Sequence, residues 1–253
     1  MLRIYDCMYF YLYDAALAEP KYSRQLADIE TRLTDLGLQG RVGRLGPLKS
    51  ASELVKSALK AGAKTIVAVG NDQTVATAIN ALMPDGANNT ALGIIPLGKP
   101  SHVASALGIS EGLESVAILA ARKTEVVDLG KINGHYFLTA AILEADNPIL
   151  LRCEDNFTLE PLHPKSALVI ANLRADTNCQ DGYLEATIES DSGRWWGRRK
   201  KRSLVPLRRG TLLAANSNTG TAVAENTYTI KLPATVEVAP QILKLIVGRH
   251  RVF

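Results

Sequence analysis

The chain has 253 residues, a formal net charge of +4 and 47% hydrophobic residues. This composition is ordinary for a folded globular protein and excludes a low-complexity or fibrous chain. Cys7, Cys153 and Cys179 lack metal-ligand spacing, so we expect neither a zinc site nor a disulfide framework, and we expect a reducing cytoplasm as the location. The apolar stretch at residues 8–13 is too short to span a bilayer and predicts a buried strand.

The first part of the chain alternates between strand and helix patterns. We predict a strand within residues 2–13, a helix over residues 22–36 and a short strand over residues 41–48. Ser50 and Glu53 then have the spacing of a capping box, which predicts the start of another helix. Two strand–helix units in succession favour a parallel sheet covered by helices.

Two further units of the same kind occupy residues 65–82 and 92–108. Each begins with a continuous apolar run, continues through a glycine-containing polar loop and ends in a helical pattern, as a buried parallel strand followed by a helix would. The loops after such strands lie at the carboxyl edge of the sheet, where open α/β folds bind ligands. We therefore expect any small-molecule site there.

The pattern changes from strand–helix units to strands and turns near residue 133. Residues 111–121 predict a helix and residues 125–129 a strand. Beyond them, the predicted strands cover residues 135–143, 166–173, 183–189, 204–206, 211–215, 228–232 and 235–238. Glu185 and Glu189 have the even spacing of a solvated sheet face. This part of the chain therefore predicts a second, all-β domain.

The two central loops carry a recognisable motif. Residues 70–74 read Gly-Asn-Asp-Gln-Thr, and residues 95–108 read Ile-Pro-Leu-Gly-Lys-Pro-Ser-His-Val-Ala-Ser-Ala-Leu-Gly. The chain here resembles the diacylglycerol kinase catalytic domain family, which includes bacterial lipid kinases and sphingosine kinases and is related to NAD kinases. The family's loops read Gly-Gly-Asp-Gly-Thr and Ile-Pro-x-Gly-Thr-Gly-Asn-Asp-Phe-Ala-Arg-x-Leu-Gly. Residues 127–130 (Val-Asp-Leu-Gly), followed by Phe137, resemble its next landmark.

The resemblance implies a fold and a site. It implies an α/β nucleotide-binding-like domain over residues 1–130 and a β-sandwich over residues 131–240, with residues 241–253 returning to the first domain. It implies that ATP or ADP, with Mg²⁺, would bind in the loops, and that Asp72 would be catalytic in an active enzyme. No separate metal ligands are predicted. The candidate nucleotide-binding residues are Gly70, Asn71, Asp72, Thr74, Gly98, Lys99, Ser101 and His102.

Several residues depart from the family pattern. Asn71 and Gln73 replace glycines, and Gln73 would crowd a phosphate, or strain the backbone if it kept a left-handed conformation. Pro100 replaces a third glycine and removes a backbone N–H. Ser101 and His102 stand where the family has Asn-Asp, while Lys99 adds a positive charge that can attract phosphate.

Two other family motifs are also lost. The loop after the first strand, residues 13–18, lacks the family's Asn-Pro-x-Ser/Ala-Gly, and the family's Asp-Gly-Glu falls by spacing on residues 225–227, which read Glu-Asn-Thr. We therefore predict a pseudokinase or weak nucleotide-binding module with little phosphoryl transfer. An active ATP-dependent lipid kinase of the diacylglycerol or sphingoid type is the alternative. A basic-patch adaptor for membrane or nucleic acid is a second alternative.

One segment concentrates the positive charge. Eight basic residues follow one another without an acid between them: Arg194, Arg198, Arg199, Lys200, Lys201, Arg202, Arg208 and Arg209. These eight positive charges exceed the net charge of the whole chain, +4, so the rest of the chain has a net charge of −4. With Trp195 and Trp196, the segment suits an anionic membrane surface and, less well, nucleic acid. A solvated hairpin is the alternative, and no oligomeric state is predicted.

Overall fold

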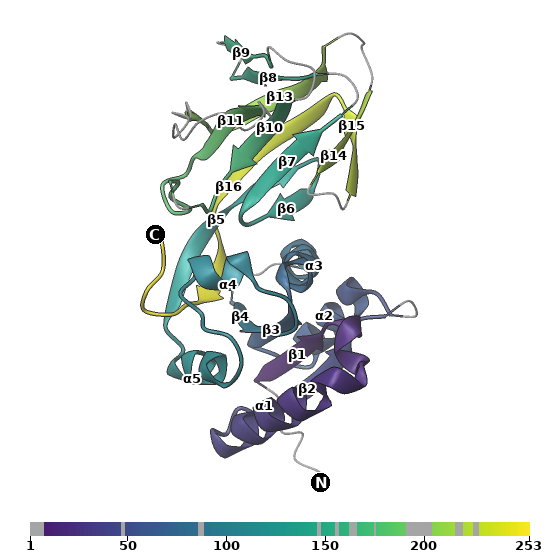
Figure 1. Ribbon diagram of the computed structural model, residues 1–253, viewed down its shortest axis with the longest axis vertical. Coiled ribbons are helices and arrows are strands. Elements are labelled where there is room, and N and C mark those ends of the chain that lie inside the picture. Colours follow the sequence, from purple (N-terminus) through teal and green to yellow (C-terminus); the bar gives the residue numbers. More distant parts are fainter. Residues whose placement is uncertain are drawn as a thin grey trace. The chain divides into compact units, whose positions relative to one another are not determined.

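The structure is a computed structural model that describes residues 8–46, 49–85, 89–145, 148–154, 157–161, 166–174, 176–190, 204–215, 220–224 and 228–253 (Figure 1). The chain divides into two compact units. The first comprises Met1–Val127 and Ile242–Val252, and the second comprises Asp128–Gln241 with Phe253.

A parallel sheet forms the centre of the first unit. Its strand order is β2-β1-β3-β4-β16, and each neighbouring pair is parallel. The strands are β1 (Tyr9–Tyr13), β2 (Gly40–Arg44), β3 (Thr65–Gly70), β4 (Ala91–Pro96) and the last part of β16 (Ala234–Ile246). Every residue of β1, β3 and β4 is buried, as expected of central parallel strands with apolar side chains on both faces.

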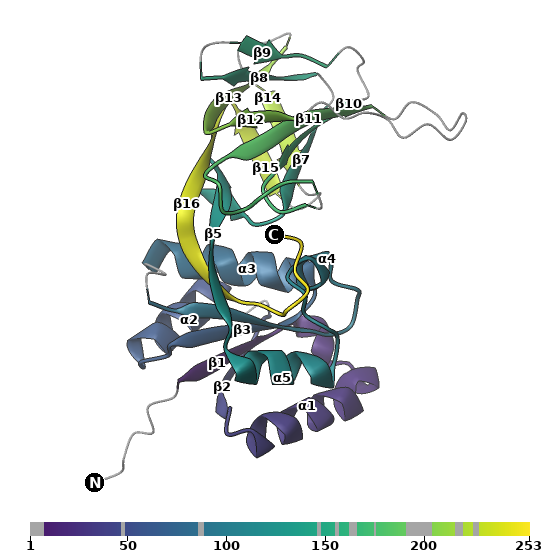
Figure 2. The ribbon, with the colours of Figure 1, turned by 90° about the vertical axis from the view of Figure 1, so that its left-hand side faces the viewer.

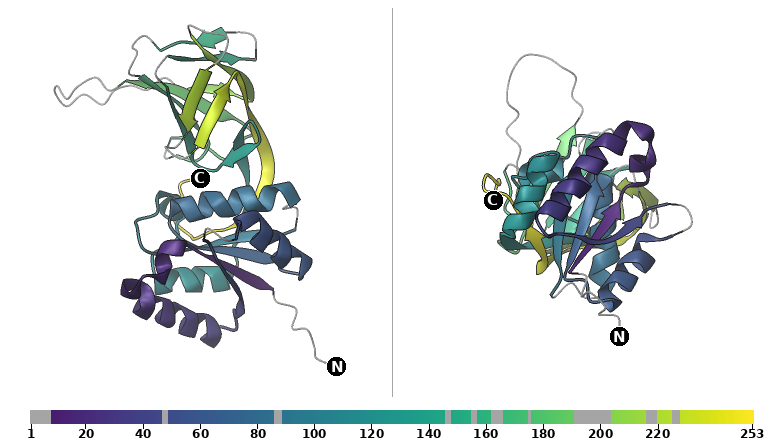
Figure 3. Two further views of the ribbon diagram at one scale, coloured as in Figure 1. Left: turned by 90° about the vertical axis from the view of Figure 1, so that its right-hand side faces the viewer. Right: turned by 90° about the horizontal axis from the view of Figure 1, so that it is seen from below.

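Helices cover both faces of this sheet. They are α1 (Ser23–Asp35), α2 (Ala51–Lys60), α3 (Asp72–Leu82), α4 (His102–Ala106) and α5 (Leu113–Ala121), with 3₁₀ helices at Ala15–Ala18, Pro20–Tyr22 and Met83–Asp85. Figures 2 and 3 show α1 and α5 on one face and α2 and α3 on the other. On its inner side α1 buries Leu26, Ile29 and Leu33, whose spacing places them on one stripe of the helix.

The predicted capping box at the start of α2 is confirmed. The backbone N–H of Glu53 donates to Ser50 Oγ at 3.2 Å, and the N–H of Ser50 donates to Glu53 Oε2 at 3.3 Å. These two bonds satisfy donors that the first turn of a helix otherwise leaves without partners.

The second unit contains two sheets that share one apolar core. One sheet is antiparallel with the order β12-β11-β10-β7-β14-β15. Its strands are β7 (Ala140–Glu144), β10 (Ser166–Ala171), β11 (Leu184–Ser190), β12 (Val205–Leu207), β14 (Gly220–Ala224) and β15 (Tyr228–Leu232). The other contains the last part of β5 (Thr124–Ile132), β6 (His135–Phe137), β8 (Ile149–Cys153), β9 (Phe157–Leu159), β13 (Arg209–Ala214) and the first part of β16. Buried side chains from both sheets, such as Leu143, Ile170, Leu151 and Leu212, form the core.

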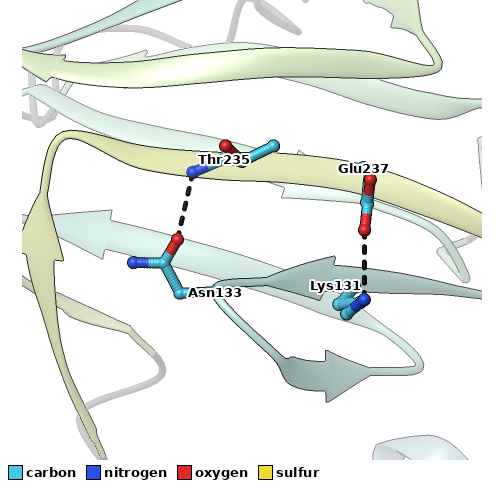
Figure 4. Close-up of polar contacts among 4 residues, drawn as sticks. All are labelled: Lys131, Asn133, Thr235 and Glu237. Carbon is cyan, nitrogen blue, oxygen red and sulfur yellow. Dashed lines mark hydrogen bonds and ion pairs between the residues drawn. The ribbon is translucent and has the colours of Figure 1, made fainter.

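The turn between β5 and β6 has a clear local cause. Asn133 and Gly134 both have positive φ, at 46° and 89°, which is the geometry that an Asn-Gly pair favours in a two-residue hairpin. Asn133 Oδ1 also accepts the N–H of Thr235 at 3.1 Å, and Lys131 Nζ pairs with Glu237 Oε1 at 3.1 Å (Figure 4). The hairpin is therefore fixed to β16 by side-chain contacts.

Gly130 and Phe137, which the sequence identified as a landmark, face each other across this hairpin. The Phe137 ring lies over Gly130 so closely that a Cβ at this position would overlap it. The aromatic ring thus fills the space above a strand glycine, which explains why the two residue types occur together.

Asp128 is a buried charge that joins three segments of the second unit. Its side chain is fully buried, and its Oδ1 and Oδ2 accept the N–H groups of Gln241 and Gly182, both at 2.7 Å. Its own N–H donates to the carbonyl of Cys179 at 2.7 Å. A buried carboxylate is tolerated only with such donors, so the loop that contains Gly182 and the bend of β16 at Gln241 are held together here.

The predicted fold class, an α/β part followed by an all-β sandwich, is confirmed. Of the strands in the described part of the chain, β8, β9 and β14 escaped prediction. The expected strand over residues 135–143 is two strands, β6 and β7, and the last predicted strand continues to Ile246. Among the described residues, no helix is long and apolar enough to cross a membrane.

The expectation that Glu185 lies on a solvated sheet face was wrong. Glu185 is only partly exposed, and its Oε2 is buried without a hydrogen-bond donor among the described residues. Burial, together with the carboxylates of Asp181 and Asp176, raises the pKa of Glu185 to about 7. Glu189 differs, since it pairs with Arg174 at 3.2 Å.

Replacing Glu185 with Gln should stabilise the protein at pH 8 but not near pH 4.5. Between the ordinary pKa of 4.5 and the folded-state pKa of about 7, the folded state binds more protons than the unfolded state. The stability of the protein therefore falls as the pH rises through this range. We expect a gain of about 1 kcal/mol at pH 8, reduced by solvent screening, or about 2–4 °C in Tm. Thermal unfolding of Glu185→Gln at both pH values measures this, and Glu189→Gln is the control. Equal gains at pH 8 and pH 4.5 would contradict the prediction.

Candidate functional site

Three loops of the first unit meet at the carboxyl ends of β1, β3 and β4. The register places Tyr13 beside Val69 and Gly70 beside Pro96, so the three strands end at the same level of the sheet. The loops that follow contain Asp14, residues 71–74 and residues 97–101. This is the edge at which open α/β sheets bind ligands.

Gly70 begins the first central loop in a conformation that requires glycine. Its φ is +152°, and a Cβ at this position would lie 2.8 Å from the Cβ of Asp14 and would also meet the side chain of Thr74. Glycine therefore allows the chain to turn from β3 into α3 at this point.

Asn71 caps α3. Its backbone is extended, with φ −101°, and its Oδ1 accepts the N–H groups of Gln73 and Thr74 at 2.9 and 3.2 Å. Gln73 lies in the first turn of α3 and is exposed, so the left-handed strain considered from the sequence does not arise. An N-cap of this kind satisfies backbone donors that would otherwise be open to an anion.

Thr74 is joined to the loop after β1. Its hydroxyl donates to Asp14 Oδ2 at 2.6 Å, and Asp14 Oδ1 accepts the N–H of Ala16 at 2.8 Å. Thr74 is fully buried. The place where the family has a glycine-containing loop is thus filled by a carboxylate and a 3₁₀ helix, and the sequence did not identify Asp14.

Asp72 connects the two central loops. Its carboxylate accepts the hydroxyl of Ser101, the N–H of His102 at 3.0 Å and the N–H of Val103 at 3.2 Å. Ser101 Oγ in turn accepts the N–H of Ala104 at 3.0 Å. Asp72 and Ser101 together satisfy the donors of the first turn of α4, so Asp72 is a helix cap as well as a candidate catalytic group.

The second central loop is partly covered. Gly98 has φ +98°, and a Cβ on it would lie 3.3 Å from the hydroxyl of Tyr22, which comes from the 3₁₀ helix before α1. Gly98, Lys99, Pro100 and His102 are exposed, whereas Ser101 is buried. Lys99 is therefore accessible to an anion in solvent.

The residues present fit Mg²⁺ and ATP only in part. An ionised carboxylate has about four acceptor positions, and Asp72 uses three of them for Ser101, His102 and Val103. Within the described parts of the chain, no group of three or more His, Cys, Asp or Glu residues is arranged to hold a metal ion. Mg²⁺ would thus find two partly occupied carboxylates, Asp72 and Asp14, of which Asp14 accepts the Thr74 hydroxyl and the N–H of Ala16. The capped N–H groups offer phosphate little.

The structure brings most of the predicted site residues to one edge of the sheet. Gly70, Asn71, Asp72 and Thr74 lie at the start of α3, and the Asp72 carboxylate bonds Ser101 and the backbone of His102. Sequence reasoning missed Asp14 and Tyr22. The position of Asp14 directly after a buried strand was the available signal for it, but no local pattern places Tyr22 beside Gly98.

Two predicted features lie outside the described residues. They are residues 225–227, at the place of the family's Asp-Gly-Glu, and the membrane-contact residues Trp195, Trp196, Arg198, Arg199, Lys200, Lys201 and Arg202. The contact with an anionic surface therefore stays a prediction. Arg208 and Arg209 are described and exposed, and the Arg208 guanidinium lies 4.6 Å from the centre of the Tyr183 ring.

Comparison with known proteins agrees with this fold. Residues 12–132 match the model of the diacylglycerol kinase catalytic domain. This part of the chain therefore belongs to the diacylglycerol kinase catalytic domain family, and the resemblance found in the sequence is confirmed.

Individual relatives carry lipid kinase names. The chain is 38% identical over 91 residues to the "Probable lipid kinase YegS-like" of Alcanivorax borkumensis. The aligned residues make up 36% of this chain and 30% of that protein. It is 26% identical over 132 residues to the diacylglycerol kinase of Bacillus subtilis, and these residues make up 51% of this chain and 43% of that protein. The chain thus spans less than half the length of these two relatives.

The fold likeness extends further. A crystal structure of a diacylglycerol kinase from Bacillus anthracis aligns with a TM-score of 0.76 at 14% sequence identity, over 95% of this chain and 96% of that one. At this identity the likeness establishes the fold.

Replacing Asp72 with Asn should destabilise the first unit. An amide presents N–H groups where the carboxylate has an oxygen, so at least one donor among Ser101, His102 and Val103 would lose its acceptor. The loss should be about 1–3 kcal/mol in the free energy of unfolding. Urea unfolding measures it, with Asp28→Asn on the exposed face of α1 as the control. If both variants unfold like the wild type, Asp72 does not hold α4.

Proposed function

We propose that this protein is a diacylglycerol kinase-family binding module that transfers phosphoryl groups weakly or not at all. One observation carries the proposal: the backbone donors that begin α3 and α4 are already bonded to the side chains of Asn71, Asp72 and Ser101. Phosphoryl transfer depends on positioned donors and cations that neutralise the phosphates. Donors that are occupied by the protein itself cannot serve this purpose without rearrangement.

Binding phosphate in the family manner would require these contacts to break. Each hydrogen bond to a charged group contributes about 1.5–3 kcal/mol, so releasing His102 and Val103 from Asp72 opposes binding. Moreover, the freed carboxylate would repel a phosphate unless Mg²⁺ lay between them. The absence of an N–H at Pro100 removes one more donor.

We propose that weak nucleotide binding remains. Lys99 is exposed at the second loop and can attract a phosphate as a point charge. ADP or ATP, with or without Mg²⁺, would then bind at the candidate residues from Gly70 to His102 without being held for transfer.

The competing function is an active ATP-dependent lipid kinase that acts on a diacylglycerol or a sphingoid base. The relatives' names favour it, and Asp72 keeps about one free acceptor position. In that case Asp72 would exchange its contacts with α4 for contacts with the reacting groups, and residues 98–103 would move when substrate binds.

Incubation with radiolabelled ATP separates the two proposals. With diacylglycerol, sphingoid bases or NAD as acceptor, we expect no product above the level of an Asp72→Ala variant. Robust lipid phosphorylation that disappears in Asp72→Ala would establish the active kinase. Product that persists in the variant would point to a contaminating enzyme.

Calorimetric titration tests the remaining binding. We expect weak binding of ADP or ATP, and we expect Lys99→Ala to weaken it further because a point charge is lost. Exposed Lys64, at the opposite end of β3, gives the matched control Lys64→Ala. If no nucleotide binds at millimolar concentration, the adaptor function replaces the nucleotide-binding function.

We also propose that the protein is cytoplasmic and contacts anionic membrane through residues 194–209. The observation that favours this is the run of eight positive charges beside Trp195 and Trp196. Each basic residue near an anionic surface contributes about 1 kcal/mol, and salt should weaken the contact.

Sedimentation with phosphatidylserine vesicles should therefore show binding at low salt that falls when the basic residues at 198–202 are changed to Gln. A variant with Lys60 and Lys64 changed to Gln is the control, because both side chains are exposed in the first unit. Equal sedimentation of all three proteins, or none at low salt, would remove this proposal.

A further inference from the structure

The helix α4 is too short to be stable without contacts to the rest of the protein. It has five residues, His102–Ala106, and an isolated helix of that length does not form in water because nucleation is unfavourable. At its start, Asp72 and Ser101 satisfy the N–H donors. Its carbonyl end must be held as well, because a helix leaves its last carbonyls without partners.

Residues 248–252, which we call the strap, supply those partners. The N–H of Gly248 donates to the carbonyl of Leu107 at 2.9 Å, and the N–H of Val252 donates to the carbonyl of Ala106 at 3.0 Å. Figure 2 shows the strap, in yellow near the C-terminus, running beside α4. The helix that follows the second central loop is therefore held at both ends by distant parts of the first unit.

Two glycines allow the strap to lie directly on the backbone after α4. Gly108 has φ +67°, and a Cβ on it would lie 2.7 Å from the carbonyl carbon of His250. A Cβ on Gly248 would overlap the carbonyl of Gly108. Side chains at either position would push the strap away, so the contact is one of backbone against backbone.

An ion pair anchors the strap to the rest of the first unit. Arg251 Nη2 lies 2.6 Å from Glu125 Oε1 at the start of β5, and these side chains are only 20% and 25% exposed. The N–H of Val247 donates to the carbonyl of Lys123 at 2.9 Å just before the strap begins. A partly buried pair with a short charge-assisted hydrogen bond is stronger than an exposed one.

We propose that the strap is a positioning element of the second central loop. By holding the carbonyl end of α4, it keeps Ser101 and the first turn of the helix against Asp72. Arg251 and Glu125 act through the strap and are positioning residues. This inference rests on the contacts within the first unit and not on whether the site binds nucleotide or transfers phosphoryl groups.

Hydrogen exchange of the whole protein tests the proposal. Arg251→Ala should increase exchange of the amides of residues 102–108 about tenfold, because local opening of α4 then loses the equivalent of one charge-assisted hydrogen bond. Exchange in α1 should be unchanged. The matched control is Arg249→Ala, since Arg249 is an exposed arginine of the same segment.

A charge exchange gives a second, independent test. Glu125→Ala should accelerate exchange at residues 102–108 as Arg251→Ala does, and the double variant Glu125→Arg with Arg251→Glu should restore protection. Equal exchange in Arg251→Ala and Arg249→Ala would overturn the proposal. So would an increase of the same size in α1, because Arg251 would then support the whole unit and not α4 in particular.

Discussion

The arrangement of the first unit depends on the Asp72 carboxylate. This carboxylate, at the start of α3, accepts hydrogen bonds from Ser101, His102 and Val103, and it thereby joins the start of α3 to the start of α4. A negative charge is favourable at both helix N-termini, because each presents unsatisfied N–H groups and the positive end of its dipole. The same contacts occupy the backbone N–H groups that a phosphate would need. Folding and phosphate binding therefore compete for the same donors at this edge of the sheet.

Retention of Asp72 in an otherwise altered motif therefore has a folding explanation. Gly70 is required by a backbone conformation and by its contact with Asp14, and Thr74 is buried with its hydroxyl bonded. Each would be kept whether or not the site transfers phosphoryl groups. Of the replacements, Asn71 and Ser101 cap helices, whereas Gln73 and Lys99 are exposed. The contacts that hold the two loops in place therefore involve kept residues, such as Thr74, and replaced residues, such as Asn71 and Ser101.

Much of the fold could be predicted because its signals are local. Continuous apolar runs gave β3 and β4, and the Ser50–Glu53 pair gave the start of α2. Strands β8, β9 and β14 were missed because strands of three to five residues between polar turns carry little periodicity. For the site, sequence located both loops, but it could not show that Asn71 and Asp72 cap helices. Asp72 meets residues 29 to 31 positions away, and such contacts leave no local pattern.

The same reasoning applies to the other end of α4. A five-residue helix contributes little stability of its own, so its position is the sum of the contacts that Asp72 makes at one end and the strap makes at the other. Asp72 bonds the helix through a flexible side chain, whereas the strap bonds it through backbone groups that Gly108 and Gly248 bring together. Side-chain contacts can be exchanged for a ligand more readily than a backbone contact anchored by an ion pair. Any opening of the second loop should therefore begin at Asp72 and turn about the end that the strap holds.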